Sequence, residues 1–501
     1  EIPEHRTHIA LLVAPDVLEA RRRELARLCS NEGKEREFHE GESHELVFEK
    51  RVSLRLFVDP EEALSAVKSQ PFNVILIDNR GSNPGSGFAG TTAGKMLPEL
   101  LAFDDPARSP NRATIFVILP KSEETAHHAF TVGALQLGGV IVDPQSLETA
   151  IESTSRTVRP SEPGKIALCL AGGGIEGMIY EMGALRALDA HLVGRSVADF
   201  DIFSGISAGA IISAFLANGV LPRELSDALH GKPSRVSPIT RGMLFDPNLS
   251  EAASRIVGAA GDFIRGHWLR KPLDTAIKVT PTAFFSGEKM KWHLEKEFTK
   301  PGMTNDFNML DKDLFVGVTD QDSGAHVTFG VDSQRDVPIS HALRASAAMT
   351  PYYPPEKIKG RFYIDGIFTR TINLDVAVAN GARLIICVDP LTPVQVDQPG
   401  YVSRRGGFFN TVQTVKAFIR TRLSEVIGRA GEAYPDVAVF VFSPTRQDLE
   451  QMSLTMMRYV YRAEIEEMAF KSVSQRIQRD FEWLSADFER HGFSLSRSPA
   501  G

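Results

Sequence analysis

The residues best suited to catalysis form a Gly-x-Ser-x-Gly pentapeptide at positions 205–209, with Ser207 at its centre. An apolar run, 202–206, leads into the serine, and a second one, 210–217, follows it. This order predicts a strand, a sharp turn and a helix, the setting in which a nucleophilic serine projects from a strained turn. The two glycines remove Cβ atoms that would clash where the chain reverses. We therefore predict that Ser207 is a nucleophile, against the alternative of a glycine-rich turn without chemistry.

A second glycine-rich turn follows the apolar run 166–171. Its glycines are Gly172, Gly173 and Gly174. Bare backbone N–H groups at the start of a helix favour an anion, so these glycines suit an oxyanion hole. The stretch 172–177 also fits the Gly-x-Gly-x-x-Gly pattern of dinucleotide sites, with Asp199 or Asp201 a little beyond the usual spacing of a ribose-binding acid. Taken alone, this turn fits both functions equally well.

A serine nucleophile requires a base. The candidate histidines are His326, His341 and His491, and because none lies just after a predicted strand we expect each to have a surface or local hydrogen-bonding role. Asp365 is a different candidate, because it ends an apolar strand predicted at 360–365 and precedes a glycine. Burial would raise the pKa of this carboxyl and allow it to accept the serine proton directly. Asp-Gly is also a common turn dipeptide, so the pair alone does not distinguish a catalytic base from a structural turn.

Four segments in this order resemble the patatin-like phospholipase family. They are 171–174, 205–209, 344–355 and Asp365-Gly366. The stretches 377–381 and 384–388 are also similar to the helix and strand that follow the aspartate in that family. The resemblance covers about 165–478 and implies a patatin-like α/β hydrolase domain with helical insertions.

The resemblance implies a calcium-independent lipid acyl hydrolase of the phospholipase A or lysophospholipase type, with a lipid as its substrate. Ser207 would be the nucleophile of a catalytic dyad and Asp365 its base, without a catalytic histidine. Gly172, Gly173 and Gly174 would supply the oxyanion-hole N–H groups. Carboxylates, histidines and cysteines show no metal-ligand spacing, so we predict neither a metal site nor a cofactor.

Two residues depart from the family pattern. Glu176 stands where the glycine loop usually has Arg or Lys, and Ile367 stands where Gly or Ala usually follows the Asp-Gly pair. Loss of a cation would weaken the binding of a lipid phosphate, so neutral glycerides and other esters stay open as substrates. Three further alternatives also stay open: a non-enzymatic or regulatory lipid-binding protein on the same fold, a nucleotide-binding protein that uses Gly172–Gly177, and acyl transfer to an acceptor other than water.

The first 154 residues alternate apolar runs with helical patterns. Strands are predicted at 9–13, 54–58, 74–78, 114–119 and 139–142, with helices at 18–28 and 60–67. Continuous apolar strands between helices are typical of a parallel sheet covered on both faces, so we predict a doubly wound, flavodoxin-like domain that resembles bacterial receivers. Asp78 takes the place of the phospho-acceptor, but Asp16 is the only acid near the metal-binding position and Asp143-Pro144 replaces Lys-Pro. We expect a degenerate receiver-like scaffold or dimerisation domain.

The predicted organisation is a receiver-like domain at 1–154, a linker at 155–164, the patatin-like domain at 165–478 and a C-terminal tail at 479–501. The linker is polar and contains two prolines and a glycine. We expect the tail to be loose, as chain ends often are.

Composition excludes several classes of protein. With 501 residues, 43% apolar and 24% charged, the chain is ordinary for a globular protein of two or three domains. The net charge of −7 is too mild to favour nucleic acid as a partner. Cys29, Cys169 and Cys387 are widely spaced, which indicates apolar fillers in a reducing compartment. The charged first residues do not resemble a signal peptide and no apolar run reaches the ~20 residues of a spanning helix, so we expect a cytoplasmic protein.

A lipid substrate also requires access to a membrane. Apolar residues, several of them phenylalanine, recur at three- and four-residue spacing across 408–430, together with Lys416 and three arginines. A basic amphipathic helix of this kind can lie on an anionic surface, so 408–430 is a candidate for peripheral membrane contact. The alternative is a helix whose apolar stripe packs on the protein core. The stretch 263–271 is a weaker candidate of the same kind.

Overall fold

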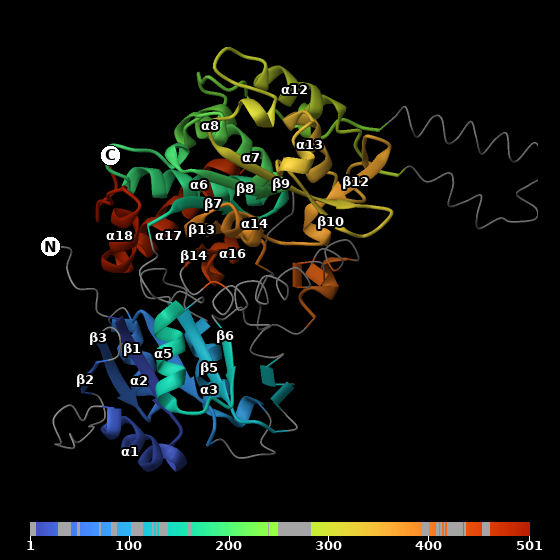
Figure 1. Ribbon diagram of the computed structural model, residues 1–501. Coiled ribbons are helices and arrows are strands. Elements are labelled where there is room, and N and C mark those ends of the chain that lie inside the picture. Colours follow the sequence, from blue (N-terminus) through green and yellow to red (C-terminus); the bar gives the residue numbers. More distant parts are fainter. Residues whose placement is uncertain are drawn as a thin grey trace, which may run out of the picture.

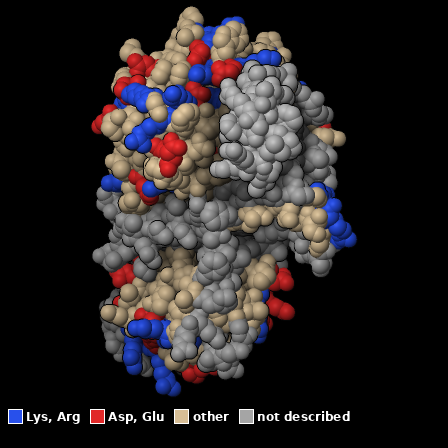
Figure 2. Space-filling view, turned by 90° about the vertical axis from the view of Figure 1, so that its right-hand side faces the viewer, with Lys and Arg blue, Asp and Glu red and all other residues tan. Residues whose placement is uncertain are grey.

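The computed structural model describes residues 7–28, 42–47, 51–69, 72–81, 88–101, 114–122, 125–126, 128–129, 139–157, 163–238, 240–248, 282–392, 400–406, 410, 413–414, 416–417, 434, 437–452 and 461–500. These residues form two lobes, each built around one β-sheet (Figure 1). On the face shown in Figure 2, Lys and Arg are interspersed with Asp and Glu over both lobes.

The N-terminal sheet has six strands in the order β2-β3-β1-β4-β5-β6. Their bounds are β1 Thr7–Val13, β2 Ser43–Val47, β3 Arg51–Phe57, β4 Val74–Asp78, β5 Ile115–Leu119 and β6 Gly139–Val142. All neighbours are parallel except β2 and β3, which are antiparallel. Five of these strands lie where the apolar runs predict them, whereas the edge strand β2 was not predicted, because its sequence Ser-His-Glu-Leu-Val has no continuous apolar run.

Helices cover both faces of this sheet, which explains why its strands are apolar without alternation. The helices are α1 Leu18–Leu28, α2 Pro60–Ser69, α3 Thr92–Leu101 and α5 Leu147–Thr157. Ile9, Leu11 and Val13 of β1 share a buried cluster with residues of α1 and α5. Ala10 and Leu12 point to the other face and join a cluster with α2 and α3. Helix α5 continues three residues into the stretch predicted as linker.

The second sheet has eight strands, seven of them in the order β11-β12-β9-β8-β7-β13-β14, with β10 paired to β9. Their bounds are β7 Lys165–Leu170, β8 Ile202–Ile206, β9 Asp313–Asp320, β10 His326–Phe329, β11 Glu356–Ile358, β12 Arg361–Asp365, β13 Ala382–Val388 and β14 Ala438–Phe442. The run from β9 to β14 through β8, β7 and β13 is parallel, and β10, β11 and β12 are joined by antiparallel pairs.

Helices again cover both faces of this sheet. They are α6 Gly174–His191, α7 Ala208–Ala217, α8 Pro222–Leu229, α9 Arg241–Leu244, α12 Glu288–Phe298, α13 Ile339–Ser346, α14 Leu374–Ala379, α16 Arg446–Met452, α17 Arg462–Arg479 and α18 Phe481–Arg490. Buried residues of α6, α7 and α17 form one cluster with the sheet, and those of α14 form another. Helix α17 packs closely along α6, because a Cβ at Gly183 would lie 2.3 Å from the carbonyl oxygen of Glu466.

The C-terminal segment is packed rather than loose, so the prediction of a loose tail at 479–501 is wrong. Helix α18 lies within it, and Phe488, Phe493 and Leu495 are buried. Leu495 forms a β-bridge with Leu192, and the N–H of Ser496 donates to the carbonyl of His191 at the end of α6 (2.7 Å). Five of the eight apolar residues in this segment are buried, which fixes it to the second lobe.

Candidate active site

Strand register brings Ser207 and Asp365 to one place in the second lobe. Strand β8 ends at Ile206, which pairs with Gly317 of the neighbouring strand β9. The next residue of β9, Val318, pairs with Asp365 at the end of β12. Adjacent strands lie about 4.8 Å apart, so Ser207 and Asp365 are at the same height with one strand between them.

Ser207 occupies the predicted turn between strand β8 and helix α7. Its backbone has φ 55° and ψ −124°, a left-handed conformation that is uncommon for a residue with a side chain. Both neighbouring glycines are required by close backbone contacts. A Cβ at Gly205 would lie 2.5 Å from backbone atoms of Ala210, and one at Gly209 would lie 2.4 Å from the carbonyl oxygen of Ala171. The Gly-x-Ser-x-Gly spacing therefore allows the turn to form against the adjacent strand.

Asp365 is 1% exposed and points at the serine. Its carboxylate accepts a hydrogen bond from the backbone N–H of Ile367 (3.0 Å) and interacts with the Ser207 hydroxyl. Burial raises the pKa of Asp365 to about 7, and the two hydrogen bonds act in the opposite direction. A carboxyl with such a pKa can both accept and release a proton near neutral pH, which is the property required of a general base.

The glycine loop 172–174 lies against the serine. A Cβ at Gly172 would lie 3.0 Å from Cβ of Ser207 and 3.1 Å from Cδ1 of Ile367. A Cβ at Gly173 would lie 2.8 Å from Cγ of Pro390, and Gly174 has φ +60° at the start of α6. Only a chain without side chains can approach the turn so closely. Backbone N–H groups of this loop, at a helix N-terminus, can stabilise negative charge that develops beside Ser207.

The acids that a nucleotide site would use lie elsewhere. Asp201 accepts a hydrogen bond from the N–H of Ile166 (2.9 Å) at the beginning of β7, whereas the glycine loop follows the end of that strand. Asp199 accepts from the N–H of Ser196 in a local cap (2.8 Å). These carboxylates lie near the beginning of β7, whereas Gly172 follows its end. This separation argues against a ribose-binding role for either carboxylate.

Each candidate histidine has a local partner. Nδ1 of His326 bonds the hydroxyl of Thr369 (2.8 Å), and burial lowers the pKa of this imidazole to about 4. His341 lies 3.2 Å from a carboxylate oxygen of Glu295, and Nδ1 of His491 bonds the carbonyl oxygen of Gly164 (2.7 Å). Among the candidate bases, the side chain that interacts with the Ser207 hydroxyl is the carboxylate of Asp365.

Two hydroxyl residues that hold the backbone of the site were missed by the sequence reasoning. Thr319 Oγ1 donates to the carbonyl oxygen of Asp365 (3.0 Å), and Ser346 Oγ accepts from the N–H of Ser207 (2.8 Å). Ser346 lies within the segment 344–355 that resembles the family, so the segment was recognised but not this side chain. Thr319 belongs to no recognisable sequence motif. Only the pairing register of β9 and β12 shows that it lies beside Asp365.

Glu176, the first departure from the family pattern, lies in the first turn of α6 and is 8% exposed. Burial raises the pKa of Tyr352 to about 12, and the charge of Glu176 adds to this rise. Burial lowers the pKa of Lys416, whereas Glu176 and Asp389 favour its charged form. A lysine from another part of the chain therefore lies near Glu176, where the glycine loop itself carries no cation.

Ile367, the second departure, adjoins the nucleophile. Its side chain is 3% exposed and packs in a small apolar cluster with Ile206 and Leu391. Met349 and Phe368 pack against this cluster. Apolar side chains therefore line the surroundings of Ser207 and Asp365 and keep them dry.

Two predicted features lie wholly or mostly outside the described residues. They are the stretch 263–271 and the amphipathic stretch 408–430, of which 410, 413–414 and 416–417 are described. Among the described helices, none is long and apolar enough to cross a bilayer. In the described part of the chain, no three His, Cys, Asp or Glu side chains are grouped so that they could hold a metal ion.

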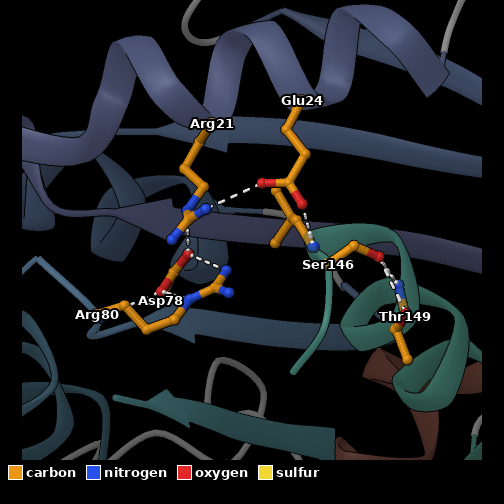
Figure 3. A network of polar contacts seen from close by, with 7 residues as sticks. Arg21, Glu24, Asp78, Arg80, Ser146 and Thr149 are labelled. Atoms are coloured by element: carbon orange, nitrogen blue, oxygen red, sulfur yellow. Dashed lines mark hydrogen bonds and ion pairs between the residues drawn. The ribbon is translucent and has the colours of Figure 1, made fainter. Parts of the chain in front are cut away.

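The N-terminal lobe places Asp78 in a different environment. It ends β4, is fully buried, and both its oxygens are paired with arginines (Figure 3). Arg80 donates to both oxygens (2.9 and 2.7 Å), and Nε of Arg21 donates to Oδ2 (2.9 Å). Arg21 also pairs with Glu24 (2.9 Å), whose other oxygen accepts the N–H of Leu147 at the start of α5. The network therefore joins β4, α1 and α5.

Comparison with known proteins gives sequence and structural matches. "Uncharacterized protein L620" of Acanthamoeba polyphaga mimivirus is 24% identical over 255 residues, which span 44% of this chain and 64% of the viral protein. VipD from Legionella pneumophila is 15% identical with a TM-score of 0.31, covering 63% of this chain and 67% of VipD. Full-length ExoU of Pseudomonas aeruginosa, solved with SpcU, is 16% identical with a TM-score of 0.23, covering 66% of this chain and 72% of ExoU.

A family model matches the region that contains the site. The model described as "Patatin-like phospholipase" matches residues 168–378, which include the glycine loop, the serine turn and Asp365. The mixed sheet and its covering helices agree with the α/β fold expected from the resemblance. Residues 168–378 of this chain are therefore similar to the patatin-like phospholipase family.

Proposed function

We propose that the second lobe hydrolyses fatty-acyl esters of lipids, with Ser207 as nucleophile and Asp365 as base. The observation that carries the proposal is the buried carboxylate of Asp365 beside Ser207, with a pKa raised to about 7. The family-model match at residues 168–378 supports a lipid as the substrate class. The domain limits that we propose remain 165–478.

In the first half of the proposed reaction, Oγ of Ser207 attacks the acyl carbon while its proton passes to Asp365. The carbonyl oxygen becomes an oxyanion that accepts hydrogen bonds from N–H groups of Gly172, Gly173 and Gly174. One such donor is typically worth about 3–4 kcal/mol in the transition state. Collapse of the tetrahedral intermediate breaks the ester bond, and Asp365 gives the proton to the departing alcohol. The acyl group is then esterified to Ser207.

In the second half, a water molecule gives one proton to Asp365 and attacks the acyl carbon of the acyl-enzyme. Collapse of this second intermediate releases the fatty acid, and the proton returns from Asp365 to Oγ of Ser207. Protein groups supply the base and the oxyanion donors in both halves, so we propose a reaction independent of calcium. Transfer to an acceptor other than water would replace only this second half.

For the substrate, we propose phospholipids or lysophospholipids, with neutral glycerides as the alternative. The apolar cluster of Ile206, Ile367 and Leu391 beside the serine suits a fatty-acyl chain. Such a substrate lies in a membrane, so we also propose peripheral membrane contact. The stretch 408–430 remains our candidate for that contact on sequence grounds.

Fluorophosphonate labelling with intact-mass readout tests the proposed function. One adduct on the wild type and none on Ser207→Ala is the expected result, because only an activated serine reacts rapidly with this probe. Fatty-acid release from phospholipid and glyceride vesicles, measured on the same two proteins, then identifies the substrate class. Equal labelling of both proteins, or undiminished acyl release by Ser207→Ala, would contradict the assignment of the nucleophile.

For the N-terminal lobe, we propose a degenerate receiver-like scaffold within 1–154. Its five parallel strands, numbered among themselves along the chain, lie in the order 2-1-3-4-5, which is the flavodoxin-like order. The paired and buried oxygens of Asp78 oppose phosphoryl transfer to this residue. Incubation with acetyl phosphate should leave the intact mass unchanged, and a phosphoryl adduct on Asp78 would contradict the proposal.

A further inference from the structure

Ser346 links the turn that carries Ser207 to the central strand β9. Its Oγ accepts a hydrogen bond from the backbone N–H of Ser207 (2.8 Å) and donates one to the carbonyl oxygen of Gly317 (2.7 Å). It is the last residue of helix α13 and is fully buried. A hydroxyl group has one donor and two acceptor positions, so it can make both bonds at once.

Two residues further along, the same segment reaches Asp365. The carbonyl oxygen of Ala348 accepts a hydrogen bond from the backbone N–H of Asp365 (3.1 Å), and Ala348 is also fully buried. The segment 346–348 therefore holds the nucleophile through a side chain and the base through a main-chain carbonyl. It fixes the two residues relative to each other.

The backbone of Ser207 needs such support. A residue with a side chain keeps a left-handed conformation only where surrounding contacts fix it. If the bond between its N–H and Ser346 were lost, the peptide could rotate, and rotation would carry Oγ of Ser207 away from the carboxylate. The bond to Gly317 prevents the Ser346 hydroxyl from turning away, because that hydroxyl is already directed at β9.

We propose that Ser346 is a positioning residue for Ser207. It holds the N–H of the nucleophile against β9 and thereby sets the direction in which the serine hydroxyl meets Asp365. This inference rests on the proposed function, which it extends from the reacting groups to the segment that aligns them. Ser346 itself does not take part in a bond-making step.

The substitution Ser346→Ala removes the acceptor and leaves the Ser207 N–H without it. We expect the rate constant of fluorophosphonate labelling and kcat to fall about 10- to 100-fold, with KM little changed, because the alignment of a bound substrate is affected rather than its binding. The matched control is Ser213→Ala on helix α7. Ser213 is also fully buried, and its hydroxyl has no hydrogen-bond partner among the described residues, so its loss should leave both rates near those of the wild type.

Two further variants separate positioning from general stability. Ser346→Thr keeps the hydroxyl and should restore most of the labelling rate. Ser346→Cys has a side chain of similar shape with a weaker acceptor, so its labelling rate should lie between those of the wild type and Ser346→Ala. If the alanine variant fails to fold, Ser346→Cys takes its place in the comparison with Ser213→Ala. The pH dependence is a third readout: the bond from Ser207 lowers the pKa of Asp365, so loosening it should move the inflection of kcat/KM to higher pH.

The outcomes distinguish this inference from the proposed function. If the wild type is neither labelled nor active on any lipid vesicle, both fail together. If the wild type is labelled and Ser346→Ala matches Ser213→Ala in labelling rate and in the inflection of kcat/KM, the positioning role is overturned while the function stands. Slow labelling of Ser346→Ala that Ser346→Thr restores supports the positioning role.

Discussion

Two buried carboxylates, one in each lobe, end β-strands in the same way but meet opposite surroundings. Asp78 is 0% and Asp365 1% exposed. Arginines contribute every side-chain donor to Asp78, whereas the donors to Asp365 are neutral, namely the Ser207 hydroxyl and a backbone N–H. Paired positive charge favours a carboxylate, while burial without it favours the protonated acid. The same side chain is therefore an ion-pair partner in the first lobe and, in the function that we propose, a proton acceptor in the second.

The difference teaches that the neighbours of a buried acid, more than its place in the fold, decide what it can do. Both aspartates are the last residues of strands with a mainly apolar sequence. An acid that must exchange protons near pH 7 has to be buried without a cation in contact. An acid clamped by two guanidinium groups instead fixes the elements that carry them, here α1 and the turn after β4.

The largest effect is expected from Asp365→Asn, which keeps the shape of the acid and removes the base. We expect kcat/KM for acyl release to fall on the order of 10³-fold or more, as for other residues that act as a unit with a serine nucleophile. Stability should not fall, because a neutral amide suits a dry site without a cation. Steady-state kinetics and thermal unfolding of the same preparation measure both quantities. Near wild-type turnover would eliminate the dyad.

Asp78→Asn in the first lobe should lower stability and leave acyl release unchanged, which is the reverse of the result expected for Asp365→Asn. Removing the charge of the acid takes one of two carboxylate partners from Arg21, which keeps Glu24, and takes the carboxylate partner from Arg80. Because both arginines are part-buried, the cost should lie at or below about 3–5 kcal/mol, the loss that is typical of a broken buried pair. We expect urea unfolding of the N-terminal lobe at lower denaturant concentration, with acyl release per folded molecule unchanged. As a control, Asp78→Leu combined with Arg21→Met and Arg80→Met should recover most of the loss, because the buried acid and both of its arginines are then replaced together and the part-exposed Glu24 keeps the N–H of Leu147. Loss of hydrolysis at unchanged stability would mean that the two acids do not differ as the structure indicates.

Much of the fold was predictable because its signals are local. Continuous apolar runs between helical stretches identified five strands of the first sheet, and the Gly-x-Ser-x-Gly turn was identified by its spacing alone. The edge strand β2 was not predicted because three of its five residues are polar. The packing of helix α18 and of the segment after it was not predicted, because it depends on a residue distant in sequence. The ring of Phe200 contacts those of Phe488 and Phe493.

The chemistry of the site was predictable only in part. Sequence motifs named Ser207 and Asp365, but they could not reveal that the two share a hydrogen bond in a dry environment. Ser346 is 139 residues from its partner Ser207, and no local pattern encodes a contact of that separation. The arginine partners of Asp78 are similar: Arg80 is two residues away, but Arg21 comes from a different helix.

The pH dependence tests the proposed role of Asp365 without mutation. Because Asp365 must be deprotonated to act as base, kcat/KM should rise about tenfold per pH unit below pH 7 and level off above it. The pKa of this acid is raised from 3.8 to about 7, so the folded state binds its proton more tightly than the unfolded state. Its contribution to stability is therefore complete below about pH 4 and is lost as pH rises to about 7, a change on the order of 4 kcal/mol.

Activity should thus increase over the same pH range in which this group ceases to stabilise the protein. Chemical denaturation at several pH values, together with the kinetic profile, measures the two trends. In Asp365→Asn, both the kinetic inflection and this part of the stability change should disappear. A wild-type kcat/KM that is flat between pH 5 and 8 would contradict a base with a raised pKa.

The smallest effect is expected from Ile367→Val, which changes only the access of water to the carboxylate of Asp365. The substitution deletes Cδ1, the atom that would lie 3.1 Å from a Cβ at Gly172. The lost methylene should cost about 1 kcal/mol of stability. A little more water beside the carboxylate should lower the pKa of Asp365, so the inflection of kcat/KM should move to lower pH by less than about one unit.

Ile9→Val in β1 of the first lobe is the matched control, because it removes the same group from an equally buried site. It should cost similar stability and leave the inflection where it was. If Ile367→Val also leaves it unchanged, the pKa of Asp365 is set by the backbone and Ser207 rather than by this side chain.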